Sequence, residues 1–172
     1  MIHSRRAILV AGAALPLQAL AQACRVTIRQ TEGPFFKPRS PERRNLLDGA
    51  TATLIVAGRV LARDCKPVAH ALLDFWHADE RGEYDNSGFR FRGHQFTDAE
   101  GRYRLETIVP AEYPGRTRHI HVRVQAQGGP ILATQIYFPN EPANARDGLF
   151  REDLVVRRSA KLGVVTFDFV AA

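Results

Sequence analysis

The sequence predicts an all-β protein, an antiparallel β-sandwich with long connecting loops that follows a cleavable N-terminal signal segment. Short segments in which apolar and polar residues alternate recur along the chain, with glycine and proline turns between them, which is typical of sandwich strands. No apolar stripe with helical spacing extends beyond about three turns. The 172 residues fit one domain, and 45% hydrophobic with 24% charged residues exclude a mainly disordered chain.

The alternation defines the expected strands in order along the chain. They are residues 53–61, 68–78, 102–109, 119–126, 131–138, 153–157 and 164–170. Turn signals separate them, such as the tight turn at 98–101, where Gly101 allows a positive φ, and the Gly-Gly-Pro break at 128–130. In the last strand Val165 and Phe169 point to the same face, as a half-buried strand requires.

Two segments of the chain lack this alternation. Residues 25–47 contain three prolines, and we expect them to form an arm that lies over the sandwich. Residues 142–150 favour a short helix. No internal repeat or linker divides residues 24–172, which we expect to fold as one domain.

Residues 1–23 are predicted to be a signal peptide. They contain Arg5 and Arg6 but no acidic residue, and they continue in an apolar run that is too short for a membrane span and ends in small residues. The paired arginines favour twin-arginine export, with ordinary secretion as the alternative. We therefore expect an exported, periplasmic protein without a stable membrane span. A lipid anchor on Cys24 is the weaker alternative, because Ala21 and Gln22 make a poor lipobox.

The basic charge does not indicate a nucleic-acid partner. Arg5 and Arg6 would leave with the signal peptide, so the net charge of +6 would fall to +4. No basic stripe alternates with exposed aromatic residues, and the chain is expected to be exported, so no nucleic acid is expected as a partner. Cys24 and Cys65 can pair in an oxidising compartment, although two unpaired thiols remain the alternative.

A candidate metal site begins with His119 and His121. The two histidines stand two residues apart on a predicted strand, so both side chains leave the same face, about 6.5–7 Å apart at their Cα atoms. That spacing suits two imidazoles on one metal, but packed or solvent-facing histidines explain the pattern equally well. Tyr84 and Tyr113 lie in polar loops, which are unusual positions for core tyrosines, and a phenolate is a hard donor suited to Fe(III).

Several further motifs occur in a fixed order between residues 30 and 138. They are QTEGPFF at 30–36, DFWHA at 74–78, GEY at 82–84, TDAEGRY at 97–103, TIVP at 107–110, RTRHIH at 116–121 and TQIYF at 134–138. Together they resemble the intradiol ring-cleavage dioxygenases, the family that includes protocatechuate 3,4-dioxygenase and catechol 1,2-dioxygenase. The fold of that family is a β-sandwich, in agreement with the strand pattern.

The resemblance implies a site and a reaction. The residues that match the family's Fe(III) ligands are Tyr84, Tyr113, His119 and His121. Tyr113 also matches the tyrosine that leaves the metal when substrate binds, Arg116 matches the arginine beside the substrate ring, and Gln135 matches the active-site glutamine. The implied reaction uses O2 to cleave a catechol-type ring between its hydroxyl-bearing carbons, giving a cis,cis-muconate-type dicarboxylate without an organic cofactor.

Some questions stay open at this stage. The spacing between Tyr113 and His119 is short, and the N-terminal helical dimerisation region typical of catechol 1,2-dioxygenases is absent. The identity of the catechol substrate and the existence of a homo-oligomer are therefore undecided. Arg90 and Arg92 could attract an anionic substrate or form a solvated face. The alternative function is a non-catalytic periplasmic β-sandwich that binds a metal or an aromatic ligand, a role that would not need both loop tyrosines.

Overall fold

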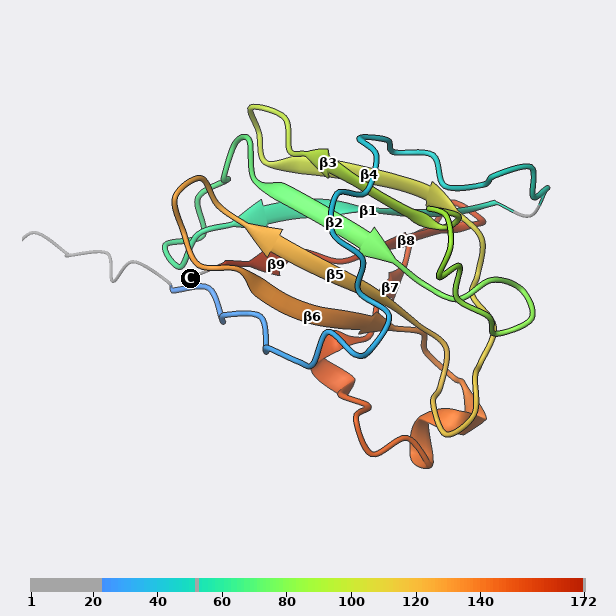
Figure 1. The fold of residues 1–172 in the computed structure, drawn as a ribbon. Helices are drawn as coiled ribbons and strands as arrows, with labels where there is room; N and C mark the ends of the chain where they lie inside the picture. The colour runs from blue at the N-terminus through green and yellow to red at the C-terminus, as the bar shows by residue number, and fades with distance from the viewer. Residues whose placement is uncertain (1–22, 52, 172) are drawn as a thin grey trace, which may run out of the picture.

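The protein is a two-layered β-sandwich, described here from a computed structural model that covers residues 23–51 and 53–171 (Figure 1). The strands are β1 (Leu54–Leu61), β2 (Leu72–Trp76), β3 (Arg92–Phe96), β4 (Arg102–Thr107), β5 (His119–Gln125), β6 (Leu132–Tyr137), β7 (Arg157–Arg158), β8 (Val164–Thr166) and β9 (Phe169–Val170). Two short 3₁₀ helices are η1 (Pro142–Ala145) and η2 (Glu152–Leu154). The all-β sandwich predicted from the sequence is confirmed.

The strands form two sheets that enclose the core. One sheet has the order β3-β2-β5-β6, and the other has the order β4-β1-β8-β7 with β9 also paired to β1. Strand β5 illustrates why the sequence folds this way, because Ile120, Val122 and Val124 alternate inward and are fully buried. His119 and His121 leave the opposite face of the same strand and are also buried. The outer face of this sheet must therefore be covered by another part of the chain.

The cover is the proline-containing arm, residues 25–47, which Figure 1 shows crossing in front of β2, β5 and β6. At one edge of the sandwich the arm bonds both sheets, since the Thr27 amide donates to Val170 O and the Gln30 amide donates to Ala133 O. At the other edge the Arg43 amide donates to His94 O on β3. The Leu46 amide donates to Glu106 O on β4. The arm therefore occupies backbone groups at both open edges and covers the outer face between them.

Several elements differ from the sequence-based prediction. Strand β3 was not expected, because its sequence Arg-Gly-His-Gln-Phe has no apolar alternation. Its pairing with β2 and the arm's bonds to its other edge supply the backbone hydrogen bonds instead. The segment 153–157 is not one strand, since η2 precedes the two-residue strand β7. The last predicted strand is divided into β8 and β9, and both run parallel to β1.

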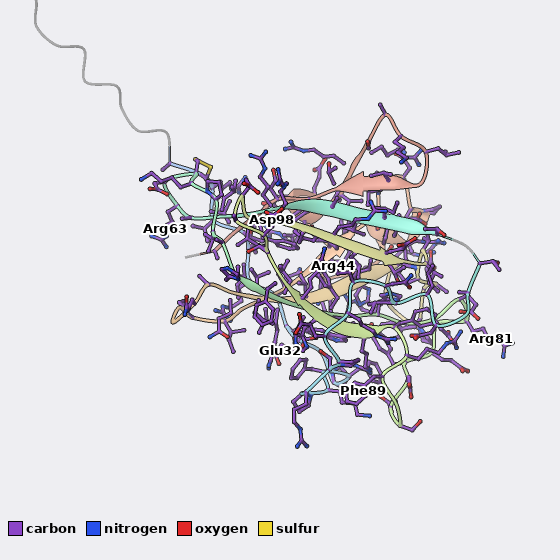
Figure 2. The ribbon with its side chains drawn as sticks, turned by 90° about the horizontal axis from the view of Figure 1, so that it is seen from above. Glu32, Arg44, Arg63, Arg81, Phe89 and Asp98 are labelled. Atoms are coloured by element: carbon purple, nitrogen blue, oxygen red, sulfur yellow. A yellow bond between two sulfur atoms is a disulfide. The ribbon has the colours of Figure 1, made fainter. Side chains whose placement is uncertain are left out.

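The two cysteines form a disulfide, Cys24–Cys65, with 5.2 Å between their Cα atoms. The bond joins the start of the arm to the turn after β1, where the Cys24 amide also donates to Arg63 O. Figure 2 shows Arg63 at this end of the molecule. The predicted signal peptide lies outside the described residues apart from its last residue, Ala23. Within the described ranges, no helix has the length and apolar character needed to cross a bilayer.

Candidate metal centre

The candidate ligands converge on the outer face of the β3-β2-β5-β6 sheet. His119 and His121 leave β5 on the same face, as their spacing predicts, and their Nε2 atoms lie 3.1 Å apart. Tyr84, in the loop between β2 and β3, brings its Oη to 3.4 Å from His119 Nε2. Three donor atoms from two separate segments of the chain therefore meet at one point.

Both imidazoles are held in the uncharged form that binds metals. His119 Nδ1 donates to Thr117 O over 2.7 Å, which leaves the lone pair of Nε2 free to act as a ligand. Burial lowers the pKa of His119 to about 4. Burial, with the neighbouring charge of His119, lowers the pKa of His121 well below its ordinary value. At neutral pH neither imidazole therefore carries the second proton that would oppose a cation, and His119 presents a free Nε2 lone pair.

The second candidate tyrosine completes the pocket. Tyr113 lies in a tight turn in which the Arg116 amide donates to Tyr113 O, and its ring centroid is 5.8 Å from that of His119. The rings of Tyr84 and Tyr113 meet edge to face at 5.9 Å. Phe35 of the arm stacks on Tyr84, with ring centroids 4.3 Å apart, and also meets the edge of Tyr113. Tyr84, Tyr113 and Phe35 therefore form one aromatic cluster beside the histidines.

Electrostatics show what kind of partner the tyrosines require. Burial, reinforced by the proximity of Tyr113, raises the pKa of Tyr84, so the phenol stays protonated without further positive charge. A cation bound beside the two Nε2 atoms would supply that charge and favour the phenolate. Within residues 23–51 and 53–171 no cluster of three or more His, Cys, Asp or Glu side chains could hold a metal. The donor set is instead two imidazoles and two phenols, which fits a hard, highly charged cation such as Fe(III).

Arg116 and Gln135 adjoin this centre, as the motif pattern predicts. Arg116 Nη2 donates to Gln135 Oε1 over 2.6 Å, and Gln135 Nε2 donates to Thr31 O of the arm. Gln135 lies on β6 directly opposite His121 on β5, in the same cross-strand row. The guanidinium and the amide are therefore fixed relative to the candidate ligands by the register of the sheet.

The comparisons with known proteins agree with this geometry. A family model described as "Dioxygenase" matches residues 31–170. Catechol 1,2-dioxygenase 2 of Acinetobacter lwoffii is 36% identical over 67% of this chain and 52% of its own length. The protocatechuate 3,4-dioxygenase beta chain of Burkholderia cepacia is 37% identical over 57% of this chain and 49% of its own length. The chain belongs to the intradiol ring-cleavage dioxygenase family.

A solved structure supports the same assignment over a longer part of the chain. The dioxygenase domain of a dioxygenase carbohydrate-binding protein fusion from Streptomyces sp. SirexAA-E is 55% identical, with a TM-score of 0.81. The match covers 85% of this chain and 97% of that domain. By contrast, this chain spans only about half the length of the two curated relatives named above.

The structure places Arg90 and Arg92 differently from the solvated face considered in the sequence analysis. Arg92 is not part of a solvated face: it is 2% exposed, donates to Phe35 O and Asp85 O, and lies 5.9 Å from the Tyr84 ring centroid. Arg90 pairs with Asp79 and Glu80. Both guanidinium groups therefore make contacts within the fold, although Arg92 Nη2 is buried without a hydrogen-bond partner among the described residues.

Asp79, which the sequence analysis did not single out, organises the loop that presents Tyr84. It is buried, and its Oδ1 accepts the amides of Arg81 and Glu83. Its backbone carbonyl accepts the Ala111 amide, which ties this loop to the segment before Tyr113. An aspartate two residues before the amide that it binds is a known turn signal, so the Asp-Glu-Arg-Gly sequence could have indicated this role.

Proposed function

We propose that this chain is a non-haem Fe(III)-dependent dioxygenase that cleaves a catechol-type ring between its two hydroxyl-bearing carbons, using O2 and giving a cis,cis-muconate-type dicarboxylate. The observation that carries the proposal is the meeting of two uncharged imidazoles and two phenols in one pocket beside a fixed arginine. The residues that would hold iron are Tyr84, Tyr113, His119 and His121. The two oxygens of a catechol would chelate ferric iron bound there, and the metal would favour their deprotonation.

The other side chains of the site have separate roles in the proposed reaction. Tyr113 lies in the turn that the Arg116 amide closes, and in the phenolate form, which bound iron would favour, its Oη can accept a proton from a catechol hydroxyl. Arg116 presents positive charge beside the place of the ring, where negative charge develops as the catechol ionises. Gln135 holds the guanidinium through its Oε1. Phe35 and Tyr84 supply apolar surface that limits the access of water.

The export of this enzyme is also a proposal. It is supported by the paired arginines near the N-terminus and by the Cys24–Cys65 disulfide, which an oxidising compartment would maintain. A lipid anchor at Cys24 and this disulfide would need the same sulfur atom. Periplasmic fractionation of the expressed full chain, with twin-arginine transport intact and disabled, tests both the compartment and the route.

Iron loading and oxygen uptake test the function directly. Protein from iron-replete cells is expected to contain iron and to absorb visible light through phenolate-to-Fe(III) charge transfer, with a band that shifts on anaerobic addition of catechol. Oxygen uptake is then measured against catechol, protocatechuate, hydroxyquinol and substituted catechols, with identification of the product. A colourless, iron-free protein would contradict the proposal. It would support the alternative of a non-catalytic β-sandwich, which the comparisons do not favour.

A matched pair of tyrosine variants makes this test specific. Tyr84→Phe is expected to weaken iron retention and the visible band, because it removes a donor at the point where the Nε2 atoms meet. Tyr103→Phe is the control, since Tyr103 is buried in the core and its hydroxyl donates to Phe167 O, away from the pocket. Equal loss of iron in both variants would indicate a general folding defect.

A further inference from the structure

We propose that Asp147 is the positioning residue for Arg116, holding the guanidinium in the orientation in which it acts on the substrate. The inference rests on the proposed function, because it gives that function's arginine a fixed partner. The sequence motifs do not include Asp147, which lies between η1 and η2 and is separated from Arg116 by 31 positions. Only the folded chain brings the two side chains together.

The contact between the two residues is a buried ion pair. Arg116 Nε donates to both carboxylate oxygens of Asp147, at 3.1 and 2.9 Å. The side chain of Asp147 is only 1% exposed and that of Arg116 is 12% exposed. A carboxylate buried to this extent requires a charged or hydrogen-bonding partner, and the guanidinium supplies both.

Asp147 is itself fixed by the backbone, so it can orient another group. Its Oδ2 accepts the Thr117 amide over 3.0 Å, and its Oδ1 accepts the Leu149 amide over 2.9 Å. Its own amide donates to Ala143 O of η1. Thr117 is the residue whose carbonyl accepts the proton of His119 Nδ1, so the carboxylate is anchored to the same backbone segment that orients a candidate iron ligand.

The hydrogen bonds define which edge of the guanidinium remains for substrate. Asp147 occupies Nε, and Gln135 occupies Nη2, which also lies 3.4 Å from the Tyr137 hydroxyl. Nη1 takes part in none of these bonds, although a hydrogen bond with the Tyr113 side chain also helps to raise the pKa of the guanidinium. A planar guanidinium held at two of its three nitrogens cannot rotate about its terminal bonds without breaking them, so the direction of Nη1 is set.

The ion pair also supplies the buried arginine with a counter-charge. Burial of Arg116 opposes its charged form, but the hydrogen bonds and negative charge of Asp147 outweigh burial and raise its pKa. Removal of the carboxylate would leave the cation both misdirected and without its counter-charge. Asp147 therefore acts on the reaction through Arg116 without touching the substrate.

The primary test removes the negative charge of Asp147 but keeps the shape of its side chain. Asp147→Asn is expected to lower the thermal midpoint, because it breaks a buried ion pair, but the folded protein should retain iron and the visible band. Its kcat is expected to fall by about 10–100-fold with a smaller change in KM. Asp64→Asn is the matched control, because Asp64 pairs with Lys66 at the surface. Wild-type kcat in folded, iron-loaded Asp147→Asn protein would overturn the proposal.

Chemical rescue separates a positioning role from a purely structural one. Arg116→Ala is expected to retain iron and lose turnover, and millimolar guanidinium ion should restore part of it by occupying the place beside Asp147. The double variant Arg116→Ala/Asp147→Asn should show no rescue, because the anchoring charge is absent. Equal rescue in the single and double variants would overturn the role of Asp147. Full activity of Arg116→Ala would instead contradict the role proposed for the arginine.

A second variant covers the case in which Asp147→Asn fails to fold or load iron. Asp147→Glu keeps the charge but lengthens the side chain, so the carboxylate no longer meets Nε and the Thr117 amide together. It is expected to load iron and to show lowered kcat with little change in KM. Wild-type kcat in this variant would likewise overturn the proposal, because charge without position would then be sufficient.

Discussion

The indole of Trp76 lies flat against the imidazole of His121, with ring centroids 4.9 Å apart and planes 3° from parallel. The two residues are direct cross-strand partners on β2 and β5, so the register of the sheet creates the contact. On another side of the imidazole lies Gly33 of the arm, where an added Cβ would meet His121 Cε1 at 3.3 Å. The orientation of this candidate iron ligand is thus determined by a strand and by the arm.

Replacement of Trp76 should affect both stability and iron binding. Trp76→Ala removes a side chain that is 2% exposed, and we expect the free energy of unfolding to fall by about 3–5 kcal/mol. The freed His121 ring should also hold iron less well. Urea denaturation and iron content measure the two effects, with Trp76→Phe expected to retain more of both. An alanine variant that held iron as well as the wild-type protein would contradict the orienting role.

The arm should be sensitive to one added methyl group at Gly33. Gly33→Ala imposes a side chain on a positive φ of 68° and crowds His121. We expect weaker iron retention as well as about 1–2 kcal/mol of lost stability. Gly128→Ala is the matched control, since Gly128 has a φ of 72° but open space around the added atom. The prediction is wrong if the two variants retain iron equally.

Loss of the Cys24–Cys65 disulfide should destabilise the domain. The bond closes a loop with a sequence separation of 41, for which chain entropy predicts about 4 kcal/mol of stabilisation. Cys65→Ser is therefore expected to lower the urea midpoint, and a reductant should lower that of the wild-type protein to a similar value without affecting the variant. Unchanged midpoints in the reduced wild-type protein would show that other contacts of the arm are sufficient.

Acid should destabilise the native state partly through His77. Its Nδ1 donates to Ala78 O and its Nε2 accepts from the Thr107 hydroxyl, and burial lowers its pKa to about 4. In the unfolded chain the imidazole titrates near its ordinary value of about 6.5. The unfolded state therefore gains a proton first as pH falls, so stability that is complete above about pH 6.5 decreases toward pH 4.

The matched measurement compares urea midpoints at several pH values for wild-type protein and His77→Gln. The amide can replace part of the hydrogen bonding but does not titrate, so the variant should lose less stability between neutral and acidic pH. His119 and His121 contribute to the same slope, because burial lowers their pKa values too. An identical slope in the two proteins would show that His77 does not contribute.

Much of the site could be predicted because its chemistry is local in sequence. The spacing of His119 and His121 places both on one face of a strand, and the structure confirms that face. Tyr84 and Tyr113 could be selected because polar loops are unusual places for tyrosine. The apolar alternation likewise predicted the sandwich, since period-two burial depends only on neighbouring residues.

Other features could not be predicted because no local pattern encodes them. Strand β3 lacks alternation, and its pairing depends on the arm and on β2. Arg92 resembles a surface charge in sequence but is buried through contacts with Asp85 O in the loop after Tyr84 and with Phe35 O of the arm. The turn at Asp79 is local, but the bond from the Ala111 amide to Asp79 O, which ties this turn to another loop, has no local signal.

The sequence by itself determined the class of fold, the family and the residue types of the candidate iron site, because these depend on periodicity and on motifs in a fixed order. Tertiary structure decided how those residues are held. Trp76 reaches His121 through strand register, Phe35 reaches Tyr84 through the path of the arm, and Asp147 reaches Arg116 across 31 positions. Such contacts join residues that have no fixed spacing, so only the closure of the whole chain brings them together.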